Sequence, residues 1–167
     1  YYSRKEIPAD LKDAGRRTIK AFESNSRFFH CEFFVLNEDK EGLGKKGDIF
    51  GLEVNMRPPG GYSPDMMNFA NDINVYQIWA NMVCYDKGYF DPEQRPYTCV
   101  YASRRRGSEY EHSHDEVFQA YGQNILMYEE MPAVLAGAMG DFAYMARFTT
   151  EEAALAYVDY VLKKKVG

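Results

Sequence analysis

The most regular alternation of polar and apolar residues lies at positions 51 to 61, GLEVNMRPPGG. Glu53, Asn55 and Arg57 take every second position, so a strand would present all three on one face. The other, core-facing side would carry Phe50, Leu52, Val54 and Met56. We therefore predict a strand over 49–57 that stops at the two prolines and two glycines that follow it.

The apolar segment before it, RFFHCEFFVL at 27–36, is short and rich in aromatic residues, which favours a second strand. The charged, glycine-bearing segment between the two would be the long connection of a hairpin. By the same alternation, Glu32 shares a strand face with His30 and Phe34. If the hairpin pairs Glu32 with Glu53, their carboxylates lie within about 5 Å of each other on one face.

The rest of the chain predicts an α+β fold, an antiparallel sheet with flanking helices. Apolar residues at steps of three and four predict helices at 7–23, 62–83, 113–122 and 149–165. Short apolar segments predict strands at 97–103, 124–131 and 141–148. Ser113 and Glu116 form a capping box at a helix start. Trp79 is expected in the core with Tyr76 and Val83, because the three share a helical spacing.

Composition excludes several classes of function. With 46% hydrophobic and 16% aromatic residues among 167, the chain has the composition of a folded protein with one sizeable core. A formal net charge of −5 gives no general attraction to nucleic acid. No membrane partner is expected, because no apolar stretch approaches a membrane span and no leader pattern opens the chain.

Three cysteines without metal-type spacing favour a reducing compartment, so we expect the cytoplasm. Whether the chain forms a homo-oligomer is left open.

Two charged clusters have simpler interpretations than ligand binding. The basic run at 104–106 is expected to be a solvent-exposed turn, balanced by the acidic residues of 109–116. His112 and His114 stand at a helix start without a third ligand nearby in sequence, which favours capping or exposure over a metal site.

Two carboxylates held together on one strand face repel each other, by roughly 1 kcal/mol in water and by several in a cleft. A divalent cation would offset this repulsion, and the oxygens of Glu32, Glu53 and Asn55 suit Mg²⁺ or Mn²⁺. Arg57 would point to the same place, where it can hold a phosphate oxygen or a developing negative charge. The alternative is a plain solvent-exposed strand face, on which such alternation is routine. A glycosidase-like carboxylate pair leaves Asn55 and Arg57 without a role.

The arrangement of Glu32 on one strand, then Glu53-x-Asn55-x-Arg57 and a Gly-rich turn, resembles the carboxyl-terminal half of ATP-grasp enzymes over roughly residues 5 to 85. It looks most similar to the branch that contains the carbamoyl-phosphate synthase large chain and biotin carboxylase. The resemblance implies that Glu32, Glu53 and Asn55 hold the Mg²⁺ (or Mn²⁺) ions that bridge the phosphates of ATP. It also implies that Arg57 is catalytic and stabilises the phosphorylated or carboxylated intermediate.

The resemblance implies roles for three more positions. Phe34 falls where the family places an apolar residue beneath the adenine, although plain core packing is the alternative for it. Gly60 and Gly61 in the PPGGY turn are candidates to bind the carboxylate of a small-molecule substrate. The hairpin connection at 37–48 is longer than is common in the family and would be an insertion.

We expect residues 1–90 to form the ATP-grasp carboxyl-terminal subdomain and residues 91–167 an appended α+β segment that packs on it. ATP-grasp enzymes hold the nucleotide between two lobes, so an amino-terminal nucleotide-binding lobe of the same protein is an expected partner. The chain alone is then expected to be inactive. One hypothesis is half of an ATP-dependent carboxylate–amine (or bicarbonate) ligase that works through an acyl phosphate. The other is a stand-alone, non-catalytic binding or regulatory module with the same half-fold.

Overall fold

The computed structural model describes residues 1–165 of the chain. Two compact units are present. The hairpin unit comprises residues 6–64 and 74–90. The carboxyl-terminal unit comprises residues 1–5, 65–73 and those from 91 onward. None of the helices in the described part of the chain combines the length and apolarity that crossing a membrane requires.

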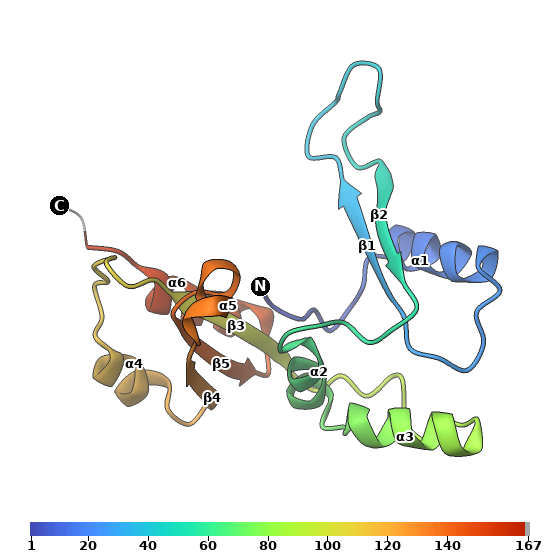
Figure 1. Ribbon diagram of the computed structural model, residues 1–167. Coiled ribbons are helices and arrows are strands. Elements are labelled where there is room, and N and C mark those ends of the chain that lie inside the picture. Colours follow the sequence, from blue (N-terminus) through green and yellow to red (C-terminus); the bar gives the residue numbers. More distant parts are fainter. Residues whose placement is uncertain (166–167) are drawn as a thin grey trace. The chain divides into compact units, whose positions relative to one another are not determined.

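The hairpin unit consists of α1 (Ala9–Ala21), β1 (His30–Val35), β2 (Ile49–Asn55) and α3 (Val75–Tyr85). The strands β1 and β2 pair antiparallel in a two-stranded sheet, which confirms the predicted hairpin (Figure 1). Its long connection is closed by backbone hydrogen bonds, among them Leu36 N to Asp48 O at 3.0 Å and Lys40 N to Gly44 O at 2.9 Å.

The carboxyl-terminal unit contains most of α2 (Ser63–Asn71), then β3 (Thr98–Arg104), α4 (His114–Tyr121), β4 (Ile125–Glu130), α5 (Ala133–Met139), β5 (Phe142–Phe148) and α6 (Glu151–Leu162). Its sheet has the order β3-β5-β4, and both pairings are antiparallel. The chain start lies beside β3, where Tyr2 bridges to Val100 and Ser3 N donates to Cys99 O at 2.8 Å. The capping box at the start of α4 is confirmed, since Ser113 and Glu116 exchange both of its hydrogen bonds.

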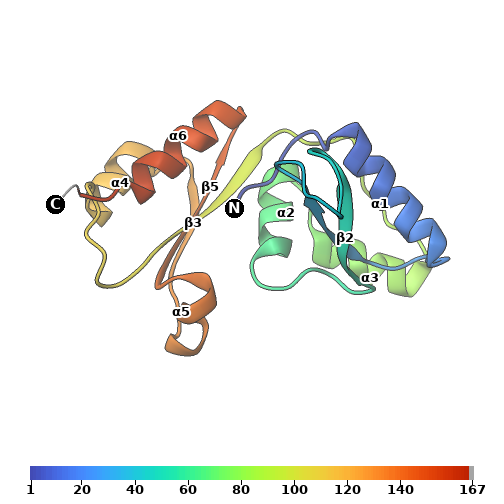
Figure 2. The same ribbon diagram turned by 90° about the horizontal axis from the view of Figure 1, so that it is seen from above.

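The main core lies between this sheet and α6, which runs alongside β3 and β5 (Figure 2). Alternate residues of β3 and β5, residues three or four apart on α6 and one residue of α4 supply it. It consists of Val100, Ala102, Val117, Tyr144, Ala146, Phe148, Ala154, Tyr157 and Val161. Because β3 and the last turn of α6 both contribute to this core, the end of β3 lies against the end of α6, where Arg104 Nε donates to Val161 O at 2.8 Å.

The α+β class with antiparallel sheets is confirmed, and three details of the prediction are wrong. The strands form two separate sheets rather than one. The helix α5 was not predicted, because its seven residues are too few to show a helical period. The predicted helix over 62–83 is two helices, since Asp72 takes a left-handed φ of 49° and Asn74 caps α3 by accepting from Gln77 N at 3.1 Å. Asn and Asp favour such breaks because their side chains compete for backbone hydrogen bonds.

The predicted burial of Trp79 is also wrong. Trp79 is 51% exposed, and Tyr76 and Val83 are exposed still further, at 55% and 65%. Helical spacing correctly places the three on one face of α3, but spacing does not show whether another element covers that face.

Candidate functional site

Glu32 of β1 and Glu53 of β2 lie directly opposite each other in the hairpin, and His30 lies opposite Asn55. Opposed residues of an antiparallel pair project from the same face of a sheet, so these four side chains gather on one face. We call the four residues the acid face. Both glutamates are exposed, whereas the side chain of His30 is only 17% exposed. The predicted juxtaposition of the two acids is therefore present.

His30 links the members of the acid face. Its Nε2 lies 3.0 Å from Asn55 Nδ2 and 3.9 Å from Glu32 Oε1. Its Nδ1 lies 3.4 Å from the backbone carbonyl oxygen of Arg57. Asn55 Nδ2 also donates to Glu53 Oε1. The imidazole thus connects both strands to the segment after β2. Sequence reasoning placed His30 on this face by alternation but gave it no role.

These contacts fix how the amide of Asn55 is used. A carbonyl oxygen only accepts, so a hydrogen bond from His30 to Arg57 O requires the tautomer with the proton on Nδ1, in which Nε2 accepts from Asn55 Nδ2. The two N–H bonds of Asn55 are then directed to His30 and Glu53. Its Oδ1 is left as the amide atom that can serve a ligand, and a carbonyl oxygen is a ligand type that Mg²⁺ and Ca²⁺ accept.

A β-bulge interrupts the hairpin immediately beside the acid face. Glu32 pairs with Glu53, but the next residue, Phe33, pairs with Gly51, so Leu52 is the extra residue. Alternation along β2 fails there: Leu52, predicted to face the core, is 55% exposed. Phe50 was also predicted on the core side. The register instead puts it opposite Phe34, and hence on the face of Phe34. Bulges of this kind re-aim side chains and are frequent near active sites.

The adenine contact predicted for Phe34 stays a prediction, but the plain core alternative does not fit. Its side chain is 58% exposed and lies on the same face of β1 as Glu32, two residues away. An exposed aromatic ring beside two acids is therefore available to a ligand.

Arg57 and the two glycines follow β2 rather than belong to it. The strand ends at Asn55, two residues earlier than predicted, so alternation does not decide where Arg57 points. Its exposed guanidinium donates from Nη1 to the carbonyl oxygen of Pro58 at 3.0 Å. Gly61 has a left-handed φ of 59°, and a Cβ added to Gly60 would meet no atom within 4 Å. The turn is thus open to a ligand at Gly60.

The donor set of the acid face fits a hard divalent cation only in part. Two carboxylates and one amide oxygen are the ligand types that Mg²⁺ prefers, but Mg²⁺ takes six ligands in all. Among residues 1–165 no group of three or more His, Cys, Asp or Glu side chains is arranged to hold a metal ion. Glu32, Glu53 and Asn55 could therefore hold an ion that completes its shell with phosphate oxygens and water.

Cys31 is no candidate nucleophile. It pairs with Val54, one position away from Glu32, and therefore projects from the opposite face of the hairpin. Partial burial raises the pKa of its thiol above the ordinary value, so the thiolate is disfavoured.

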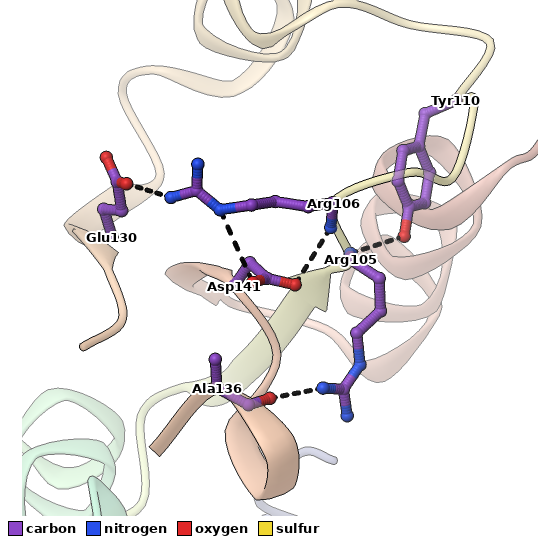
Figure 3. Close-up of polar contacts among 6 residues, drawn as sticks. All are labelled: Arg105, Arg106, Tyr110, Glu130, Ala136 and Asp141. Carbon is purple, nitrogen blue, oxygen red and sulfur yellow. Dashed lines mark hydrogen bonds and ion pairs between the residues drawn. The ribbon is translucent and has the colours of Figure 1, made fainter. Parts of the chain in front are cut away.

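Of the two other charged clusters, the basic run differs from its prediction, whereas His114 is exposed at the start of α4, as predicted. The basic run is not simply a solvated turn, because Arg104 is only 6% exposed. Arg106 pairs with Glu130 and Asp141, which lie outside the acidic segment that was expected to balance it (Figure 3). His114 begins α4 as predicted but packs among aromatic rings, 4.6 Å from the ring centroid of Tyr128.

Comparisons with known proteins add a fold similarity. No family model matches the chain, and no curated protein matches it significantly. A solved structure does match: phosphoribosylglycinamide synthetase from Anaerococcus prevotii, with a TM-score of 0.58 and 11% sequence identity. The match covers 99% of this chain and 44% of the synthetase, so the chain spans less than half the length of that protein.

The similarity concerns the fold alone, because the identity is low. Phosphoribosylglycinamide synthetase is an ATP-grasp enzyme, and the match shows that this chain has a fold like that of part of it. The match does not favour the branch of carbamoyl-phosphate synthase and biotin carboxylase. The chain therefore has an α+β fold similar to part of an ATP-grasp enzyme.

Proposed function

We propose that this chain is the metal- and ATP-phosphate-binding half of an ATP-dependent carboxylate–amine (or bicarbonate) ligase that works through an acyl-phosphate intermediate. The observation that carries the proposal is the direct opposition of Glu32 and Glu53 on one face of the hairpin. Opposed like charges destabilise a strand pair, so their placement needs a compensating role. Binding a cation that also touches phosphate oxygens provides one.

The other residues of the site have roles that fit this function. His30 and Asn55 hold the carboxylate of Glu53 in place through the hydrogen bonds described above. Arg57 would exchange the neutral carbonyl of Pro58 for an anionic oxygen, which is a stronger acceptor for a guanidinium. A bound Mg²⁺ would neutralise charge along the phosphates, so that positioning and electrostatics supply most of the catalysis. Phe34 would contact the adenine, and Gly60 and Gly61 the substrate carboxylate.

The proposal also includes the branch of the superfamily and the class of reaction. The Glu-x-Asn-x-Arg sequence and the PPGG turn support the branch of the carbamoyl-phosphate synthase large chain and biotin carboxylase. The similarity in fold to a synthetase supports a ligase as the class of enzyme. The partner would be an amino-terminal lobe of the same protein that closes over the nucleotide. The cytoplasm, where we place the protein, would supply the ATP.

The test is Mg²⁺-dependent binding of a non-hydrolysable ATP analogue, measured by calorimetry on the wild-type protein and on two variants. Glu53→Ala should abolish the Mg²⁺-dependent part of binding. Glu41→Ala is the matched control, because Glu41 is an exposed acid of the same hairpin outside the acid face, and it should bind like the wild type. Undiminished binding by Glu53→Ala would overturn the proposal.

The second candidate is a non-catalytic binding or regulatory module. It rests on the two opposed glutamates and the exposed Phe34, which offer contacts to a ligand without requiring catalysis. One observation distinguishes the two candidates. A lysine-bearing α+β lobe encoded ahead of Tyr1 or in a neighbouring gene would support the ligase, and its absence would support the module. With such a lobe supplied, the ligase should release phosphate from ATP when its acid substrate is present, whereas the module should bind the nucleotide without turnover.

A further inference from the structure

Arg104, the last residue of β3, is a buried cation in the carboxyl-terminal unit. It follows Val100 and Ala102 on the core face of the strand and is 6% exposed. A charged side chain at a core position is unfavourable unless it is paired and fully hydrogen-bonded. Its contacts therefore show whether the fold alone accounts for an arginine there.

Those contacts satisfy only part of the guanidinium. Nε donates to the carbonyl oxygen of Val161 at 2.8 Å, in the last turn of α6, where carbonyls lack helical partners and carry partial negative charge. The guanidinium carbon lies 4.7 Å from the ring centroid of Tyr110 and 5.5 Å from that of Tyr144. Nη2 is buried and has no hydrogen-bond partner, and Arg104 takes part in none of the ion pairs among the described residues. No carboxylate among the described residues therefore pairs with the positive charge of Arg104.

The guanidinium groups of the two neighbouring arginines, Arg105 and Arg106, already have hydrogen-bond or ion-pair partners (Figure 3). The guanidinium of Arg105 donates to the carbonyl oxygens of Ala136 and Gly137 near the end of α5. Arg106 pairs with both Glu130 and Asp141. Arg104 therefore differs from both, because it alone of the three has a buried and unpartnered donor.

A pocket of about 310 Å³ opens beside Arg104. Basic, hydroxyl and aromatic side chains line it, and no carboxylate does. The lining residues in addition to the three arginines are Gly107, Ser108, Tyr110, His114, Tyr128, Phe142 and Tyr144. The Tyr128 and Tyr144 rings are 5.0 Å apart, and His114 Nδ1 lies 3.1 Å from the hydroxyl of Tyr144. The pocket is therefore electropositive at one end and aromatic along its walls.

We infer that this pocket binds the oxyanion group, phosphate or carboxylate, of a small ligand with an aromatic or apolar body. The anion pairs with the charge of Arg104 and reaches the hydroxyl of Ser108, and the body lies against Tyr128 and Phe142. A charge-assisted hydrogen bond to a guanidinium is roughly twice as strong as one between neutral groups. The volume is near the lower end of the range of about 300–1,000 Å³ for small-molecule sites, which limits the ligand to a small one.

The site is independent of the acid face, because all its residues belong to the carboxyl-terminal unit and those of the acid face to the hairpin unit. Failure of one proposal therefore leaves the other standing.

The test is an NMR titration of the protein with three probes of one shape: phenyl phosphate, benzoate and neutral phenol. We expect saturable shifts of the amides of Ser108, Tyr110 and Tyr128 with one or both anions and none with phenol. Binding by phenyl phosphate alone identifies a phosphate ligand, and binding by benzoate alone a carboxylate ligand. Shifts that are absent with both anions, or equal with phenol, overturn the inference.

Arg104→Met keeps the length of the side chain without its charge and should weaken anion binding about tenfold or more. Arg16→Met is the matched control, since it removes the same charge from an exposed position on α1 in the other unit, and it should leave binding unchanged. Unchanged binding by Arg104→Met overturns the inference. If Arg104→Met does not fold, the location and anion dependence of the wild-type shifts decide.

Discussion

Replacing Glu53 by Gln should stabilise the hairpin unit while it removes cation binding. Gln keeps the shape of the side chain and an oxygen that can still accept from Asn55 Nδ2, the donor that contacts Glu53 in the wild type. The variant therefore changes chiefly one thing, the negative charge that stands opposite Glu32.

The expected magnitude follows from the register. Directly opposed residues have Cβ atoms about 4.5–5.5 Å apart, so the charges are taken as about 5 Å apart. Because both glutamates are exposed, water is the appropriate medium, and the repulsion is about 0.8 kcal/mol. Screening at physiological ionic strength, where the Debye length is about 8 Å, reduces it to roughly 0.4 kcal/mol. Glu53→Gln should raise the free energy of unfolding by that amount, and more at low salt.

The assay is urea unfolding of the wild type, Glu32→Gln, Glu53→Gln and the double variant, each at low and at high NaCl. In the double-mutant cycle the two acids should show a repulsive coupling that shrinks as salt is added. Mg²⁺ should stabilise the wild type and not the variants, because a ligand stabilises only the state that binds it. Glu41→Gln, in the hairpin connection, is the control for a general charge effect.

A coupling energy of zero at low salt would show that the two carboxylates are too far apart to repel each other. A coupling that is unaffected by salt would show that it is not electrostatic. Either result would refute the reasoning that links the register to a cation site.

Four further variants test the fold around both sites. Ser113→Ala removes the oxygen that accepts from Glu116 N at 3.2 Å and should cost about 0.5–2 kcal/mol in urea unfolding; no loss would contradict the capping box. In the other half of the box Ser113 N donates to Glu116 Oε2 at 2.7 Å, and this bond holds the pKa of Glu116 below its ordinary value. The contribution of Glu116 to stability is therefore present above the ordinary pKa and lost as pH falls through the lowered one, so Glu116→Gln should flatten the acid side of the stability–pH curve. Gly61→Ala forces a side chain into a φ of 59° and should cost about 1–2 kcal/mol, whereas an unchanged unfolding midpoint would show that the turn is relaxed. Met145→Ala, at a side chain that is 1% exposed, should cost about 2–5 kcal/mol, and a smaller loss would mean that the sheet core is loosely packed.

The sequence was sufficient to predict the hairpin and the strand face of each acid, because alternation and a hairpin between adjacent strands both act locally. The register that sets Glu32 opposite Glu53 entered only as a condition, and the structure supplies it. The sequence was not sufficient to predict the bulge. One extra residue at Leu52 leaves the alternation of the printed sequence intact, and only the cross-strand hydrogen bonds show that the register shifts. The positions of Phe50 and Leu52 were therefore predicted on the wrong side. His30 carried a signal, its place on the face of Glu32, but its links to Asn55 and Arg57 depend on three-dimensional distances.

Arg104 shows the same limit for the carboxyl-terminal unit. A run of three arginines before a glycine is typical of a solvated turn, and nothing in the run separates the first arginine from the others. Its burial arises because β3 extends one residue beyond the predicted strand end and the last turn of α6 lies beside it. A contact between residues 57 positions apart cannot be read from local pattern.

The most direct measurement on the proposed cation site uses Mn²⁺ as a paramagnetic probe together with a non-hydrolysable ATP analogue. We expect the NMR signals of the Glu32, Glu53 and Asn55 amides to broaden before any others, and the effect to disappear in Glu53→Gln. Broadening that begins instead at the acids of the hairpin connection, or that persists unchanged in Glu53→Gln, would contradict a cation site on the acid face.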